Sequence, residues 1–177
     1  DFPSPYYDAN DGWPSYLLIN DGRGNFTEGT EAAGLVAKRH RRTWASSFVD
    51  LDDDNVLDLV VINDFAGLDY YLNDGRGRFT DVTKNLKGNR GSFGMSHAFA
   101  DFDGDGHLDL YMTGMGSTTA RRLERMGAGR AEFPKHQANR MKLGYGNRIY
   151  LGDNNGGLAE APFSDVISRT GWSWGCT

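Results

Sequence analysis

Short apolar segments alternate with clusters of aspartate, asparagine and glycine along most of this chain. The segments 44–49, 57–62 and 108–113 are rich in apolar, aromatic and β-branched residues, and each borders such a polar cluster. Their length and composition are typical of β-strands, and no helical period fills the space between them. The pattern therefore predicts a protein built of short strands joined by tight turns.

The pattern is repeated along the chain. The sequence NDGRG occurs at Asn20 and again at Asn73, 53 residues later, and a third hairpin sequence, IYLGDNNGGLAE, begins at Ile149. The acidic segments DLDDDNVLDL and DFDGDGHLDL begin at Asp50 and Asp101, 51 residues apart. Four antiparallel strands, the last two joined by an Asp-Gly turn, account for a period of about 50 residues. We therefore expect an all-β fold made of four-stranded β-propeller blades.

The repeats divide the chain into four parts. Residues 1–35 are expected to form the end of one blade, 36–88 and 89–171 two blades with an acidic loop each, and 172–177 the start of the next. Residues 117–143 interrupt the third part and are expected to form a partly helical surface insertion. A propeller closes with four to eight blades, which at this period takes at least about 210 residues. These blades are thus expected to belong to a larger propeller that other blades or chains complete.

Both acidic segments place aspartates at every second position, where their like charges repel and favour a bound cation. Oxygen ligands at positions 1, 3, 5, 7 and 9 of a tight loop are typical of calcium, with a backbone carbonyl at position 7. The predicted ligands are Asp50, Asp52, Asp54, the Val56 carbonyl and Asp58 in the first loop, and Asp101, Asp103, Asp105, the His107 carbonyl and Asp109 in the second. The sequence thus predicts two Ca²⁺ sites, each with about seven ligands at about 2.3–2.6 Å.

Other metals and loop types fit these segments less well. Position 6 is Asn55 or Gly106, the residue types that best accept the left-handed backbone of a sharp turn. An EF-hand needs glutamate at position 12, where this chain has Val61 and Met112 inside predicted strands. Magnesium prefers fewer carboxylates, and transition metals prefer histidine or cysteine. Calcium is therefore the favoured ion.

Composition adds few constraints. The chain has 177 residues, a net charge of -5 and a mean hydropathy of -0.58. No apolar run approaches the roughly 18 residues of a membrane-spanning helix, so we expect no membrane span. The single cysteine, Cys176, has no partner for a disulfide within the chain and is expected to be a small buried residue. His97 is expected to be a packed strand residue rather than a general base.

Two basic tracts leave alternatives open. The tract KRHRR runs from Lys38 to Arg42, and the insertion holds seven basic side chains against Glu124 and Glu132. The basic side chains of the insertion are Arg121, Arg122, Arg125, Arg130, Lys135, Arg140 and Lys142. These tracts either bind an anionic polymer or serve as solvated faces and ion-pair partners of acidic neighbours. The segment TTARRLERMGAG is expected to form a short helix that ends at a glycine.

Several segments resemble FG-GAP/VCBS-type repeats, which are related to the calcium-binding blades of integrin α-subunit propellers. They are FVDLDDDNVLDLVV, FADFDGDGHLDLYM, NDGRGRFTDVT and RTGWSWGC. The resemblance extends over nearly the whole chain apart from the insertion, although the Gly-Ala-Pro element of the integrin branch is absent. It implies a propeller protein that is secreted, periplasmic or on the cell surface, and that binds, adheres or scaffolds.

The expected function is therefore calcium-stabilised binding of a protein or glycan ligand, without catalysis. The ligand is expected to be anionic if the 38–42 tract or the insertion contacts it, and a nucleic acid is not expected. Two alternatives stay open: a structural subunit of an extracellular assembly, and a polysaccharide-active enzyme on a propeller scaffold. The enzyme would need an acid/base group, and the aspartates at hand are assigned to metal.

Overall fold

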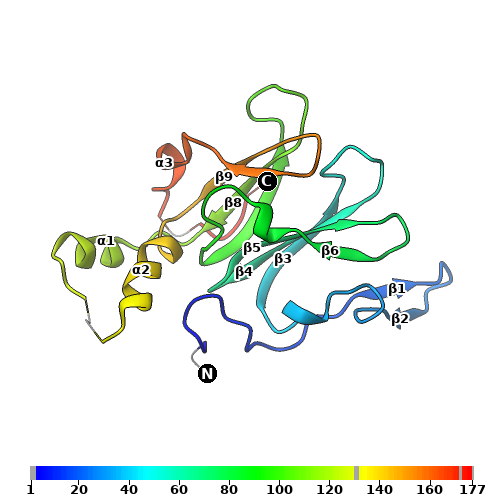
Figure 1. The fold of residues 1–177 in the computed structure, drawn as a ribbon, viewed down its shortest axis with the longest axis horizontal. Coiled ribbons are helices and arrows are strands. Elements are labelled where there is room, and N and C mark those ends of the chain that lie inside the picture. The colour runs from blue at the N-terminus through cyan, green and yellow to red at the C-terminus, as the bar shows by residue number, and fades with distance from the viewer. Residues whose placement is uncertain (1–2, 130–131, 172, 177) are drawn as a thin grey trace.

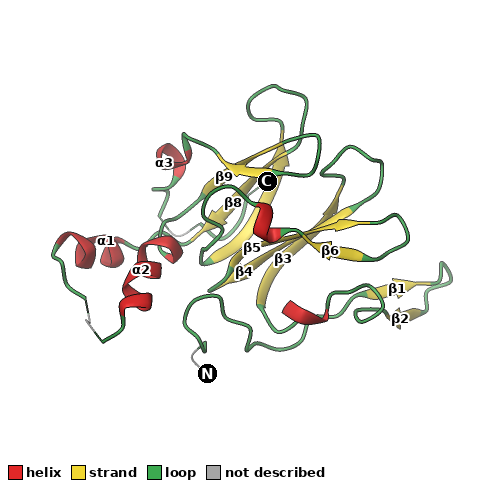
Figure 2. Cartoon of the chain, in the orientation of Figure 1, coloured by secondary structure: helices red, strands yellow, loops and turns green. Residues whose placement is uncertain are grey.

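The computed structural model describes residues 3–129, 132–171 and 173–176, and these form two four-stranded antiparallel sheets and a separate hairpin (Figures 1 and 2). The first sheet contains β3 (Arg42–Val49), β4 (Asp58–Asp64), β5 (Gly67–Asn73) and β6 (Phe79–Asp81) in that order. The second contains β7 (Gly94–Ala100), β8 (Asp109–Gly114), β9 (Arg148–Gly152) and β10 (Leu158–Glu160), also in chain order. The predicted all-β fold of four-stranded antiparallel sheets is confirmed. Within the described residues the sheets do not close into a ring.

Alternation along β4 and β5 gives the first sheet two apolar faces. Val60 pairs with Tyr70 and Ile62 with Leu68, and all four side chains are fully buried. They pack against the facing residues Leu110, Met112 and Tyr150 of the second sheet. Because neighbouring strand residues point to opposite faces, Leu59, Val61 and Tyr71 lie on the other side with Ala33 and Phe79. The first sheet therefore sits between the second sheet and the N-terminal segment.

The first strands of the two sheets lie near each other, since β7 packs beside β3 and β4. His97 on β7 places Nε2 2.8 Å from Oγ of Ser47 on β3. Its ring also meets Phe99 edge-on. Burial lowers the pKa of His97, so the ring is neutral at neutral pH. The structure agrees with the expectation of a packed strand histidine.

The separate hairpin consists of β1 (Leu18–Asn20) and β2 (Phe26–Glu28), whose six residues are all exposed. Its turn is built like the turns that join β5 to β6 and β9 to β10. In each, an aspartate N–H donates to the carbonyl four residues on, from Asp21, Asp74 and Asp153 at 3.0, 3.0 and 3.1 Å. The carboxylate of each accepts the N–H two residues on, at 2.7–2.9 Å. The hairpin sequence thus adopts one structure three times.

Short helices complete the fold. They are η1 (Val36–Lys38), η2 (Thr83–Asn85), α1 (Thr118–Arg125), α2 (Pro134–Leu143) and α3 (Ser164–Ile167). The insertion between β8 and β9 holds α1 and α2 and extends to the left of the sheets in Figure 1. Ser117 caps α1, because its Oγ accepts from Ala120 N–H at 3.0 Å. Among the described helices, none has the length and apolar character needed to span a bilayer.

The described C-terminal residues 173–176 adopt no strand. Cys176 places Sγ 3.9 Å from Oγ of Ser96 on β7. It is only partly buried, unlike the buried cysteine expected from the sequence, because the segment that carries it forms no ladder with β7. Residue 172, the first of the expected next blade, lies outside the described residues, as does Arg130 of the insertion.

Replacing residues 118–141 by a short Gly/Ser loop is expected to leave cooperative unfolding intact. The ends of the insertion already meet, since Ser117 N–H donates to Gly144 O at 2.9 Å. Leu143 O also accepts Phe93 N–H, from the segment before β7, at 3.2 Å. Closing a loop half as long changes the free energy by only about 0.6 kcal/mol. Urea unfolding followed by circular dichroism would measure this. Loss of the cooperative transition would show that α1 and α2 belong to the core.

Candidate metal centres

Each acidic loop joins the first two strands of a sheet. The first begins at Asp50, directly after β3, and ends at Asp58, the first residue of β4. The second begins at Asp101 after β7 and ends at Asp109, the first residue of β8. Val49 pairs with Asp58, and Ala100 pairs with Asp109, so both loops leave the ladder at equivalent positions. Because β3 pairs with β4 in the same register as β7 pairs with β8, the two loops have the same length and the same end points.

Left-handed backbone shapes both loops. Position 6 has φ 65° at Asn55 and 92° at Gly106, in agreement with the turn predicted there. Position 4 is left-handed as well, with φ 59° at Asp53 and 79° at Gly104. The second turn was missed from the sequence, although Gly104 is the signal that indicates it. Two left-handed residues, two positions apart, let each loop curl back toward its first aspartate.

That first aspartate organises the loop. Asp50 accepts the N–H groups of Asp54 at 3.1 Å and Asn55 at 2.8 Å. Asp101 likewise accepts the N–H groups of Gly104 at 2.7 Å and Gly106 at 3.0 Å. A carboxylate ringed by backbone N–H groups fixes the loop before any ligand arrives. The remaining lone pairs of these oxygens are available to a cation.

The last aspartate ties the loop to the neighbouring strands. Asp58 is 1% exposed and accepts Leu51 N–H at 2.9 Å and Asn73 N–H at 2.8 Å. Asp109 is fully buried and accepts the equivalent groups, Phe102 N–H at 2.7 Å and Gly152 N–H at 2.8 Å. Burial raises the pKa of Asp58. The aspartate at position 9 thus stabilises the fold in both blades through these hydrogen bonds, whichever ligand the loop holds.

The carboxylate oxygens come together in threes. Asp50, Asp52 and Asp54 place one oxygen each within 4.8 Å of one another in the first loop, and Asp101, Asp103 and Asp109 do so in the second. Of the predicted carboxylate ligands, Asp58 and Asp105 lie outside these groups. Asp105 instead accepts His107 N–H at 2.8 Å, as Asp54 accepts Val56 N–H at 2.7 Å.

The surroundings of the Asp52 carboxylate indicate whether a cation fits the first loop. Its Oδ1 is shielded from solvent and accepts no hydrogen bond from the described residues. Burial and the charges of Asp58, Asp54 and Asp50 raise the pKa of Asp52. A buried oxygen without a donor, among like charges, is costly unless a cation pairs with it. The donor set is oxygen alone, so these residues fit a hard divalent cation.

The two loops touch. His107, at position 7 of the second loop, places Nδ1 2.9 Å from Oδ2 of Asp53 in the first. The hydrogen bond to Asp53 raises the pKa of His107. From the sequence, only the backbone carbonyl of His107 was predicted to take part in the site. Residue spacing did not indicate the contact of its imidazole with Asp53, because the two residues belong to different blades. Both loops therefore lie side by side at one end of the sheets (Figure 1).

The basic tract from Lys38 to Arg42 serves the fold. Lys38 Nζ lies 2.7 Å from Asp69 and 2.7 Å from Asp81. Arg41 is 5% exposed and pairs with Asp69, which is 1% exposed, at 2.9 Å and with Asp8 at 2.7 Å. The tract thus pairs with acidic neighbours, the second of the two alternatives that the sequence left open.

The partners of this tract hold distant segments together. Arg42 pairs with Asp11 at 3.2 Å, and Arg39 lies over the ring of Tyr16 at 4.8 Å. Burial alone would raise the pKa of Asp8, but hydrogen bonds from Arg90 and Arg41 hold it below its ordinary value. The ion-pair cluster Asp8, Lys38, Arg41, Asp69, Asp81 and Arg90 therefore joins the N-terminal segment to the first sheet and to the connection between the two sheets.

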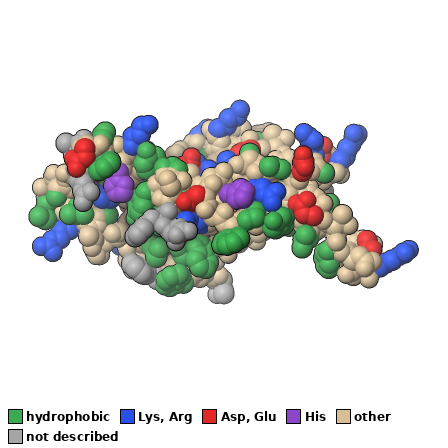
Figure 3. Space-filling view, turned by 90° about the horizontal axis from the view of Figure 1, so that it is seen from below, with side chains coloured by type: hydrophobic (Ala, Val, Ile, Leu, Met, Phe, Trp, Pro, Cys, Tyr) green, Lys and Arg blue, Asp and Glu red, His purple; other side chains and the backbone are tan. Residues whose placement is uncertain are grey.

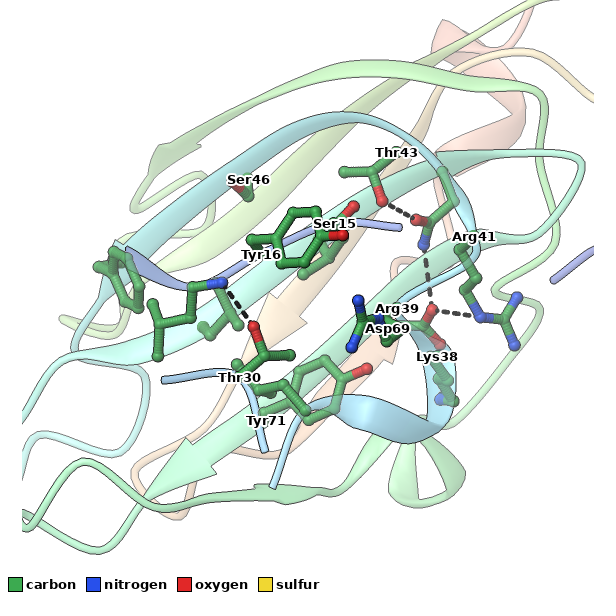
Figure 4. Close-up of a pocket in the computed structure, with 16 residues that line it drawn as sticks. Ser15, Tyr16, Thr30, Lys38, Arg39, Arg41, Thr43, Ser46, Asp69 and Tyr71 are labelled. Atoms are coloured by element: carbon green, nitrogen blue, oxygen red, sulfur yellow. Dashed lines mark hydrogen bonds and ion pairs between the residues drawn. The ribbon is translucent and has the colours of Figure 1, made fainter. Parts of the chain in front are cut away.

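A pocket of about 210 Å³ lies between this cluster and the apolar face of the first sheet. Figure 4 shows Asp69, Arg41 and Lys38 together at one end and the rings of Tyr16 and Tyr71 along the walls. Thr43 donates to Asn63 at 2.8 Å, and Asn63 donates to Asp69 at 3.0 Å. Lys38 and Arg41 both pair with Asp69 at this end, although Arg39 Nε and Arg41 Nη1 have no hydrogen-bond partner among the described residues. This end of the pocket is therefore part of the ion-pair cluster.

Comparison with known proteins agrees with this geometry. A family model described as an FG-GAP-like repeat matches residues 50–112, which run from the first aspartate of the first loop into β8. Among curated proteins, none matches the chain. The matched span contains β4 to β7, the first residues of β8 and both acidic loops, while β3 lies before it. Residues 50–112 of this chain are therefore similar to an FG-GAP-like repeat, in agreement with the resemblance stated from the sequence.

Proposed function

We propose that this chain is a calcium-stabilised segment of an extracellular β-propeller protein that acts in binding, adhesion or scaffolding, without catalysis. The observation that carries the calcium proposal is the buried Asp52 oxygen without a donor, in a loop built twice with the same register. Secretion follows from the same proposal, because carboxylate loops of extracellular modules bind calcium with millimolar affinity and need the calcium found outside cells.

The residues that would hold calcium are those of the two loops. They are Asp50, Asp52, Asp54, the Val56 carbonyl and Asp58, and Asp101, Asp103, Asp105, the His107 carbonyl and Asp109. Calcium would supply a positive charge that neutralises the clustered carboxylates. It would thereby link β3 to β4 and β7 to β8, the strands that the two loops join. The backbone N–H groups around Asp50 and Asp101 keep the loops in shape for it.

Exposed apolar side chains support the proposal that further blades or another chain complete the propeller. On β3, Trp44 is 60% and Phe48 is 49% exposed, and on the hairpin Ile19 is 54% and Phe26 is 61% exposed. Strand faces of this kind are normally buried against another sheet. The same surface favours a structural assembly as the second candidate function, in which the covering sheet belongs to another subunit.

Adding 10 mM calcium to chelator-treated protein is expected to raise the melting temperature by roughly 3–10 °C for each occupied site. Asp52→Ala and Asp103→Ala are each expected to remove the contribution of one loop. Glu31→Ala, which removes an exposed carboxylate outside both loops, serves as the control and should keep the full calcium response. Differential scanning calorimetry with calcium, magnesium and chelator measures this. Equal melting temperatures with calcium and chelator would refute the calcium proposal.

A further inference from the structure

The helical insertion has a basic pocket that the fold does not use. A pocket of about 690 Å³ lies where α1 meets the segment after α3, and its charged lining residues are Arg121, Arg122, Arg125 and Arg169. Among the described residues, no aspartate or glutamate lines this pocket. Figure 3 shows Lys and Arg side chains at the surface of the end of the molecule that the insertion forms. Four guanidinium groups around one hollow repel one another unless an anion joins them.

The arginines of this pocket differ from Arg41 and Arg42 of the 38–42 tract, because they form no ion pair among the described residues. Arg121 donates to Tyr145 O at 2.6 Å, which fixes its side chain without neutralising it. Among the described residues, Arg122, Arg125 and Arg169 have no ion pair, and all three are exposed.

Nearby acids are occupied elsewhere. Glu124 on α1 pairs with Arg140 on α2 at 2.7 Å, and Asp165 on α3 accepts the hydroxyl of Tyr145. Helix spacing brings Arg121 and Arg125 to one face of α1, with Arg122 beside them. The pocket therefore presents four guanidinium groups, of which Arg121 is held in place, with no carboxylate among its described lining residues.

We propose that this pocket binds an acidic glycan through its sulfate or carboxylate groups. Guanidinium groups bind planar carboxylates and sulfate-like oxyanions with paired hydrogen bonds. The lining adds the Thr118 hydroxyl, which suits a sugar hydroxyl, and the Gly116 N–H, which donates to Gly171 O at 3.3 Å and closes this side of the pocket. Among the described lining residues there is no aromatic ring on which a nucleotide base would stack. The inference rests on the proposed binding function and names its ligand class.

The test compares two double variants that remove equal charge. Arg122→Gln with Arg125→Gln changes the pocket, and Arg76→Gln with Arg78→Gln changes two exposed arginines of the β5–β6 hairpin. Calorimetric titration with a heparin-derived tetrasaccharide and with tetragalacturonate, at about 0.15 M salt, separates sulfate from carboxylate recognition. The pocket variant is expected to bind at least one of these glycans tenfold or more weakly, about the loss of one charge-assisted hydrogen bond. The hairpin variant should stay within about twofold of the wild type.

Three results would overturn the inference: no binding of either tetrasaccharide by the wild-type protein, equal losses in both variants, or tighter binding of a single-stranded oligonucleotide through the same arginines. The calcium response is measured on the same samples. If glycan binding fails while calcium still stabilises the protein, the inference alone is wrong. If calcium has no effect on the melting temperature, the calcium part of the proposed function is wrong, whether or not the tetrasaccharides bind.

Discussion

Asp69→Asn is expected to lower the free energy of unfolding by about 3–5 kcal/mol, because it removes the buried counter-charge of the Arg41 guanidinium and leaves only the more exposed Asp8. Asp69 is 1% exposed and lies 2.9 Å from Arg41 Nε, 2.7 Å from Lys38 Nζ and 3.6 Å from Arg90. Three cations converge on this one carboxylate. Its loss would loosen the contact of the N-terminal segment with the first sheet and with the connection that carries Arg90.

Asp81→Asn is the matched control for this prediction. Asp81 pairs with the same Lys38 at 2.7 Å, but its side chain is 39% exposed. Solvent screens such a pair, so its loss should cost at most about 1 kcal/mol. Urea unfolding followed by tryptophan fluorescence gives both values. Equal losses in the two variants would show that burial does not decide the strength of this cluster.

Gly67→Ala is expected to destabilise the protein by roughly 2–5 kcal/mol, the sum of a left-handed backbone penalty and a steric clash. Gly67 opens β5 with φ 80°, and a Cβ there would lie 1.8 Å from Arg90 O and 2.7 Å from Ser92 N. Both are backbone atoms, so no side-chain rotation relieves the contact. Leu68 N–H donates to the same Arg90 carbonyl at 3.0 Å, which holds the segment between the blades in place.

Gly75→Ala separates the backbone penalty from the steric clash. Gly75 has a similar φ of 75°, but its nearest neighbour would be Val56 Cγ2 at an ordinary 3.5 Å. This variant should therefore lose only the backbone part, about 1–2 kcal/mol. Thermal and urea unfolding of both variants measure the difference. A loss at Gly67 no larger than that at Gly75 would mean that the connection at Arg90 moves freely.

Features that depend on nearby residues could be predicted from the sequence. The strand after the first loop, expected at 57–62, is β4 (Asp58–Asp64), and the turn at Asn55 has the expected left-handed φ. The first helix of the insertion was also expected, because Gly127 follows its last turn. The second helix, α2, was not, although Pro134 at its start is a signal for one. Strand patterns and turn residues depend only on nearby positions in the chain, which is why these elements could be predicted from the sequence.

Features that depend on distant residues could not be predicted. The partners of Arg41 are Asp8 and Asp69, 33 and 28 positions away, and only the folded chain brings them together. The contact between His107 and Asp53 likewise joins two blades. A run of basic residues looks the same whether its counter-charges come from this chain or from a ligand. The structure separates the two cases by showing which arginines are paired.

The hydrogen bond from Ser117 N–H to Gly144 O has a consequence for engineering. The two strands that flank the insertion are held at a fixed, short separation, independently of what lies between them. Any domain whose own termini lie close together could be grafted at this point without a long linker. The blade would then act as a rigid mount, and the orientation of the grafted domain would be set by β8 and β9.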